Sequence, residues 1–203
     1  MKKFLPRFFS VVFHPLLSLF YAALLIFHSG HYSRFIDTEL VFAVLLIFLI
    51  LTAVLPAILM PFLYYQRTIP DLRLRERKSR LSVYVLMLIL YVINSFLLYR
   101  FAFPDLFRDV MLSGTIILGI VSVVSLFYHV SAHTVAIGGL TGLCMFMNIQ
   151  FNVDLRLEFI ILFLLSGIIG SSRLALAYHK PHEIYTGFIL GGGCMGGCMY
   201  LLV

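Results

Sequence analysis

Seven apolar runs, each close to the length of a membrane span, constrain this chain more than any other feature. A transmembrane helix needs about 20 mostly apolar residues, and runs of that kind recur along the whole sequence. They cover roughly residues 8–28, 40–64, 81–100, 109–128, 134–150, 157–172 and 184–203. We therefore expect an all-α, polytopic membrane helix bundle with six or seven spans, seven being the direct count, in which residues 1–203 form a single membrane domain.

The composition agrees with a lipid environment. Hydrophobic residues make up 62% of the chain and charged residues 12%, whereas soluble domains average about 45–50% and about 25%. These values exclude a soluble enzyme, a disordered chain and a disulfide-stapled secreted domain. The run 8–28 is too long for the apolar region of a signal peptide and has no clear cleavage site, so we interpret it as the first transmembrane helix.

Basic residues are unevenly shared between the two membrane faces. If every run spans, the N-terminus shares one face with the loops after the second, fourth and sixth spans, and this face holds 11 of the 15 Lys and Arg residues. The positive-inside rule then favours a cytoplasmic location for it, in a multi-pass protein of the bacterial inner membrane. Nucleic acid is not an expected partner, because the basic residues lie between spans. The basic residues of this face are Lys2, Lys3, Arg7, Arg67, Arg73, Arg75, Arg77, Lys78, Arg80, Arg173 and Lys180.

Three polar segments gather at this same face: residues 66–80, 128–134 and 171–183. Polar residues near membrane depth are costly and indicate function by default. Arginines can hold a phosphate through planar forks, and a helix N-terminus can add its unpaired N–H groups. A histidine can attack phosphorus, and a second one can protonate the leaving oxygen.

The last of these segments has the most specific spacing. Ser172-Arg173 is followed by five residues, His179, three residues and Glu183. This pattern resembles the third motif of the type 2 phosphatidic acid phosphatase superfamily of membrane lipid phosphatases, with Glu in place of Asp. If Pro181 lies in the first turn of the last helix, His179 and Glu183 lie close together.

The other two segments resemble the remaining motifs of that superfamily. Residues 131–133 keep the Ser and His of Pro-Ser-Gly-His, and residues 73–80 keep two basic residues at the spacing of Lys, six residues, Arg-Pro. Residues 172–183 complete the set in the family's order. The resemblance implies that His179 is the nucleophile, that Glu183 orients it and that His133 is the general acid. It implies phosphate binding by Arg73, Arg80, Ser131 and Arg173, with no metal and no other cofactor.

The expected function is therefore an integral membrane lipid phosphatase that acts through a phosphohistidine. Its substrate would be a phospholipid or polyprenyl phosphate whose headgroup enters the basic face while its tails stay in the bilayer. One alternative is a non-catalytic lipid-phosphate-binding or transport protein. Another is a membrane di-iron oxidase, for which the relevant residues would be His129, His133, His179 and His182. The sequence gives no role to His14.

Small residues suggest where helices approach closely. Gly192/Gly196 and Gly193/Gly197 form small-xxx-small pairs in the last span, and the fifth span contains three glycines between residues 138 and 142. Such pairs allow close contact between membrane helices. We expect these two helices to pack behind the site; a homodimer contact is the second interpretation.

Overall fold

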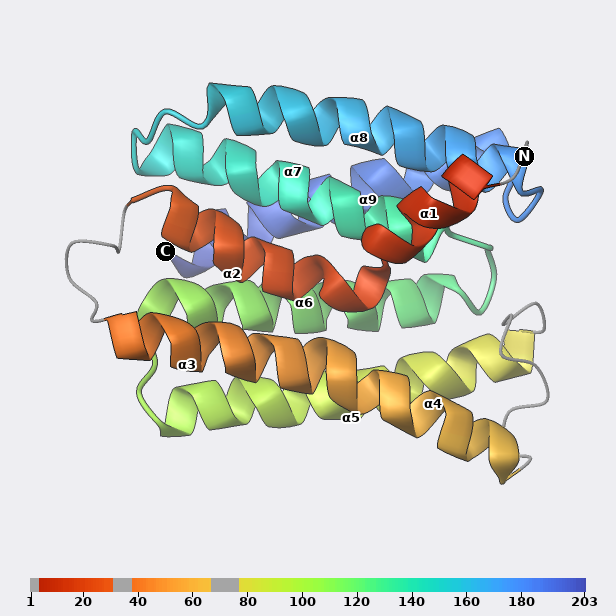
Figure 1. Cartoon of the computed structure of the whole chain (residues 1–203), viewed down its shortest axis with the longest axis horizontal. Helices are drawn as coiled ribbons and strands as arrows, with labels where there is room; N and C mark the ends of the chain where they lie inside the picture. The colour runs from red at the N-terminus through yellow and green to blue at the C-terminus, as the bar shows by residue number, and fades with distance from the viewer. Residues whose placement is uncertain (1–3, 31–37, 67–76) are drawn as a thin grey trace.

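The computed structural model describes residues 4–30, 38–66 and 77–203, which form a bundle of helices with the two termini at opposite ends (Figure 1). It contains seven helical segments long and apolar enough to cross a membrane, which confirms the expected all-α polytopic fold. The helices are α1 (Phe4–Val12), α2 (Ser18–His28), α3 (Thr38–Leu49), α4 (Leu55–Tyr65), α5 (Arg77–Arg100), α6 (Asp105–Val124), α7 (Ala132–Gln150), α8 (Arg156–Ala175) and α9 (Pro181–Leu202).

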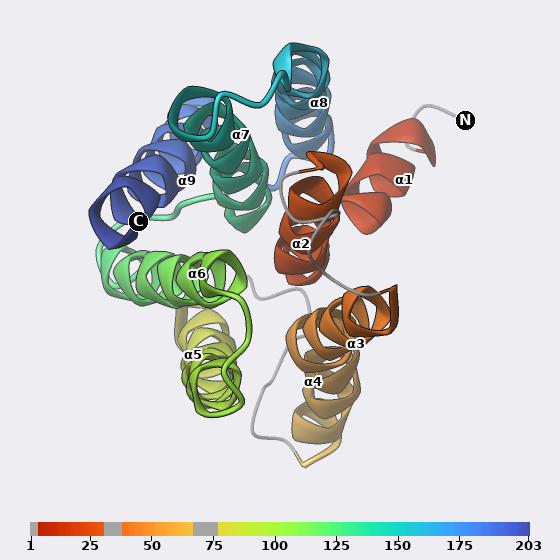
Figure 2. The same cartoon turned by 90° about the vertical axis from the view of Figure 1, so that its left-hand side faces the viewer.

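The first span is broken, where the sequence predicted one continuous helix. A short 3₁₀ helix (Pro15–Leu17) separates α1 from α2, and α1 lies at an angle to α2 (Figure 2). Proline has no N–H to continue the helix and pushes the preceding residue out of the helical region; accordingly His14 has an extended backbone, with φ −67° and ψ 139°. The break turns the His14 side chain toward the interior of the bundle, where it lines a cavity.

The second span is also irregular. A π-helical segment (Ile50–Val54) joins α3 to α4, next to Pro56, which cannot donate a hydrogen bond to the preceding turn. The hydroxyl of Thr52 donates to the Phe48 carbonyl at 2.6 Å and approaches the Leu16 carbonyl at 3.3 Å. The irregular turn is thereby linked to the break in the first span.

The fourth span differs from its predicted bounds. Helix α6 begins after Pro104 and ends at Val124, four residues before the predicted end at residue 128. Helix α7 then begins at Ala132, two residues before the predicted start. As a result, His129 lies in the α6–α7 connection and His133 lies in the first turn of α7.

Helices α7 and α9 approach each other through glycines. A Cβ atom added to Gly191 would lie 2.0 Å from the Val135 carbonyl oxygen, and one added to Gly142 would lie 2.4 Å from the Gly192 carbonyl oxygen. Only glycine permits this backbone approach, as the small-residue pattern predicted. For the pair Gly193 and Gly197 the prediction was wrong, because among the described residues nothing lies within 4 Å of an added Cβ at either position. The close packing holds the starts of α7 and α9 side by side.

Candidate functional site

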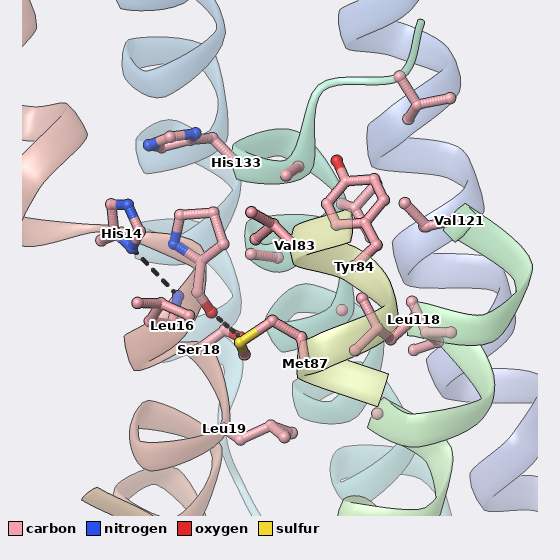
Figure 3. A pocket seen from close by; sticks show the side chains of 18 of the residues that line it. His14, Leu16, Ser18, Leu19, Val83, Tyr84, Met87, Leu118, Val121 and His133 are labelled. Carbon is pink, nitrogen blue, oxygen red and sulfur yellow. Dashed lines mark hydrogen bonds between the residues drawn. The ribbon is translucent and has the colours of Figure 1, made fainter. Parts of the chain in front are cut away.

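A cavity of about 420 Å³ extends into the bundle from the end that carries the N-terminus. In Figure 3, His14 and His133 face each other at its polar end, and Met87 and Leu19 lie further along it. The starts of α5, α7 and α9 and the end of α8 meet around this polar end. The polar side chains that line it include Arg80, His129, His133, Arg173 and His179.

His179 and Glu183 meet across the first turn of α9. The His179 Nδ1 atom lies 2.9 Å from Oε2 of Glu183, and the Lys180 N–H donates to the same oxygen at 3.0 Å. Pro181 occupies the first turn of α9, so the contact predicted from the four-residue spacing is present. Both side chains are nearly buried, with 8% and 9% of their surface exposed. Glu183 does not line the cavity but lies behind His179.

The surroundings of His179 favour its neutral form. Burial lowers the pKa of His179 to about 4, although the hydrogen bond to Glu183 acts in the opposite direction. At neutral pH the imidazole therefore carries one proton, and a carboxylate partner places that proton on Nδ1. The Nε2 lone pair is then the group available for reaction.

His129 adds a second imidazole to this pair. Its ring centroid lies 4.5 Å from that of His179, and its Nδ1 atom lies 3.6 Å from Oε2 of Glu183. Burial lowers the pKa of His129, and the nearby Arg80 lowers it further.

Among the described residues, one group could hold a metal ion: His129, His179 and Glu183. Their potential ligand atoms lie within 4.8 Å of one another. The four histidines of the di-iron alternative do not come together in this way. His133 pairs with His14 instead, and His182 is exposed, with its ring against Tyr128.

His133 contacts the N-terminal segment. Its Nε2 atom donates to the Ser10 carbonyl at 3.1 Å, and its ring is nearly perpendicular to that of His14 at a centroid distance of 5.5 Å. The Nδ1 atom of His14 accepts the Leu16 N–H at 3.3 Å. His14 is thus a site residue that the sequence left without a role. The available signal was a histidine directly before a proline inside an apolar run.

Two arginines approach the cavity from different helices. Arg80 is buried near the start of α5, and Arg173 lies in the last turn of α8. The Nε atom of each is buried without a hydrogen-bond partner, and neither forms an ion pair with any carboxylate in the described part of the chain. Arg173 donates to the Ser10 hydroxyl at 3.4 Å and lies over the Tyr178 ring at 4.7 Å. Buried unpaired cationic groups are costly, which makes this end of the cavity suited to an anion.

Arg73 and Ser131 are the other two predicted phosphate ligands. Arg73 lies outside the described residues. Ser131 is the N-cap of α7, but its hydroxyl makes no cap hydrogen bond and is buried without a partner in the described structure. Ser131 is also not among the residues that line the cavity.

Comparison of the chain with protein-family models, with curated proteins and with solved structures found no match. The chemistry must therefore be argued from the cavity. It is lined by the neutral imidazole of His179, which a carboxylate holds, by three further histidines (His14, His129 and His133) and by two guanidinium groups. This combination can bind an oxyanion and attack its central atom.

Proposed function

We propose that this protein is an integral membrane lipid phosphatase, which hydrolyses a phosphomonoester or diphosphate on a lipid headgroup through a phosphohistidine. The observation that carries the proposal is the shared cavity wall. On it lies His179, backed by Glu183, together with two arginines that pair with no carboxylate of residues 4–30, 38–66 and 77–203. The spacing of the three sequence motifs supports the same assignment. We also infer a location in the bacterial inner membrane, with the cavity on the cytoplasmic side.

In the first step Nε2 of His179 attacks phosphorus, and the bond from phosphorus to the lipid oxygen breaks. His133 gives a proton to that oxygen, so that the lipid alcohol leaves, and Arg80 and Arg173 stabilise the charge on the phosphoryl oxygens. Glu183 stabilises the imidazolium character that His179 gains. For this step His133 must be an imidazolium, a state that the charge of a bound phosphate favours. It then keeps the Nε2 proton that the Ser10 carbonyl accepts in this structure and gives its second ring proton to the leaving oxygen.

In the second step water attacks phosphorus and the bond to His179 breaks. His133, now neutral, accepts a proton from the water, and inorganic phosphate leaves. The net reaction is lipid phosphate plus water giving lipid alcohol plus phosphate, and both histidines return to their starting protonation states.

The charges around the cavity support an anion rather than a metal ion as the ligand. Arg80 is close enough to lower the pKa of His129, and Arg173 acts in the same sense on His179. A divalent cation between these imidazoles would be repelled by both guanidinium groups. In addition, Oε2 of Glu183 already accepts the Lys180 N–H and faces His179.

The test is phosphate release in detergent from a panel of lipid phosphates and from p-nitrophenyl phosphate. His179→Ala should reduce turnover by about 10⁴-fold or more, because the nucleophile is lost. His182→Ala is the matched control, since this exposed histidine is near in sequence and outside the cavity wall, and it should retain wild-type turnover.

A second measurement looks for the intermediate. The leaving group of p-nitrophenyl phosphate needs little protonation, so His133→Ala should still form the phosphohistidine but release it slowly. The pH stability of the labelled protein identifies the phosphorylated residue, because a histidine phosphate is labile in acid and stable in base, whereas a carboxylate phosphate is labile in base. Phosphate binding without any hydrolysis would instead support the non-catalytic alternative, and wild-type turnover by His179→Ala would refute the mechanism.

A further inference from the structure

The cavity continues far beyond the groups that would bind phosphate. Its lining follows α5 from Arg80 to Tyr91, eleven residues that correspond to about 16 Å along a helix. Beyond the polar end most of the wall is formed by apolar side chains and glycine, including Leu19, Met87, Ile117 and Met195, and Tyr91 adds a phenol at the deep end. Phosphate chemistry gives no reason for an apolar extension of this length.

The volume indicates what could fill it. Apolar cavities of about 150 Å³ stay dry and take up benzene. The present cavity, at about 420 Å³, is nearly three times that size. It therefore has room for a phosphate and on the order of a dozen carbons. That space accommodates one hydrocarbon chain of a lipid but not two.

Small and flexible side chains keep the deep part open. A Cβ atom at Gly114 would lie 2.9 Å from Cδ2 of Leu19, whereas one at Gly139 would meet only the Met195 Cε atom at 3.8 Å and the Gly191 carbonyl oxygen at 3.9 Å. An added carbon at Gly139, which lines the cavity, would therefore make only ordinary van der Waals contacts, both with α9. The three methionines of the wall, Met60, Met87 and Met195, can adapt to different chain shapes.

We propose that one hydrocarbon chain of the substrate enters the bundle through this cavity, and that the protein therefore prefers lipid phosphates with a single chain. This rests on the proposed function, because the phosphate group must be held at Arg80 and Arg173 for the chain to point along α5. It also replaces the expectation from the sequence that the tails stay in the bilayer.

Photolabelling tests the chain position without requiring turnover. The probe is dodecyl phosphate with a diazirine at the end of its chain, added to wild-type protein and to His179→Ala in detergent. Labels on Leu19, Met87, Ile117 or Met195 are expected. Labels confined to exposed apolar residues such as Phe163 and Leu164 on α8 would overturn the proposal, even if the protein proves not to be a phosphatase.

Turnover provides the second test. For wild-type protein, kcat/KM should be higher for dodecyl phosphate than for p-nitrophenyl phosphate, and higher than for a diacyl lipid phosphate with chains of the same length. We compare variants by the chain preference, which is kcat/KM for dodecyl phosphate divided by kcat/KM for p-nitrophenyl phosphate. Gly139→Leu should lower this ratio by about tenfold or more, because the leucine side chain occupies space that several carbons of the substrate chain would fill.

The matched control is Gly167→Leu on α8, where an added Cβ has no described neighbour within 4 Å; its ratio should equal that of the wild type. If Gly139→Leu does not fold, Gly139→Ala should show a smaller decrease in the same direction. An unchanged ratio in a folded Gly139 variant would overturn the proposal. Absence of all turnover would instead count against the proposed function and leave photolabelling to decide the chain position.

Discussion

The Nδ1 atom of His179 lies 2.9 Å from Oε2 of Glu183, within the first turn of α9. Replacing Glu183 by Gln keeps the shape of the side chain but removes the charge that stabilises an imidazolium. We expect Glu183→Gln to lower kcat/KM by about a hundredfold or more, as for other carboxylates that orient a catalytic histidine, and Glu183→Asp to retain much more activity. Wild-type turnover by Glu183→Gln would show that the carboxylate only interacts with the helix N-terminus.

The pH dependence follows from the same contact. Burial lowers the pKa of His179 from 6.5 to about 4, and the bond to Glu183 acts against this decrease. The nucleophile must be neutral, so kcat/KM should fall as the pH decreases through about 4 and not through 6.5. Glu183→Gln removes the opposing effect and should move this acid limb to still lower pH. An acid limb that stays at 6.5 in both proteins would exclude His179 as the titrating nucleophile.

Arg173 should not be replaceable by another cation. A guanidinium can hold two phosphate oxygens in one plane, whereas an ammonium group acts as a point charge. We expect Arg173→Lys to lower kcat/KM and the affinity for vanadate together, each by about tenfold or more. Arg156→Lys is the control, because this exposed residue at the other end of α8 pairs with Asp154 at 2.9 Å. Equal vanadate affinity in wild type and Arg173→Lys would contradict the assignment.

The sequence predicted the parts of this structure that depend on local chain geometry. Four residues across a helix start suffice to bring His179 to Glu183, and the parity of the spans suffices to bring Arg80, His133 and Arg173 to one end of the bundle. Both predictions need only the length of a span and the rise of a helix. Because each span crosses the whole bundle, the order of the spans decides at which end each connecting segment lies.

Contacts between distant segments could not be predicted in the same way. The approach of Ser10 to Arg173 and His133 depends on the angle between α1 and α2, which follows the break before Pro15. The depth of the cavity depends on which faces of the surrounding helices meet. Apolar membrane helices carry little polar pattern from which to determine their rotation. The sequence therefore led to the proposed headgroup chemistry but gave no indication of the interior space beside it.

The glycines between α7 and α9 should have unequal effects on stability. Gly191→Ala would place a methyl group 2.0 Å from the Val135 carbonyl oxygen and should destabilise the fold by about 1–3 kcal/mol through overpacking. Gly193→Ala has no described neighbour within 4 Å and should be neutral or stabilising by about 0.5–1 kcal/mol, because alanine suits a helix interior better. Thermal unfolding in detergent measures both. Equal melting temperatures for the two variants would contradict the close approach of the helices.

Membrane orientation is decided by one reporter, because the two termini lie at opposite ends of the bundle (Figure 1). The cavity lies at the end that carries the N-terminus, with 11 of the 15 basic residues expected on that face. From the positive-inside rule we predict that the cavity opens toward the cytoplasm and that Val203 lies on the outer side. In a bacterial host, alkaline phosphatase fused after Val203 should be active and a green fluorescent protein fusion should be dark. Removing the three arginines of the predicted phosphate site from the count leaves eight basic residues against four, so the bias becomes weaker but keeps its direction. The reverse pattern would place His179 at the outer surface, where it could reach only lipid phosphates that have already crossed the membrane.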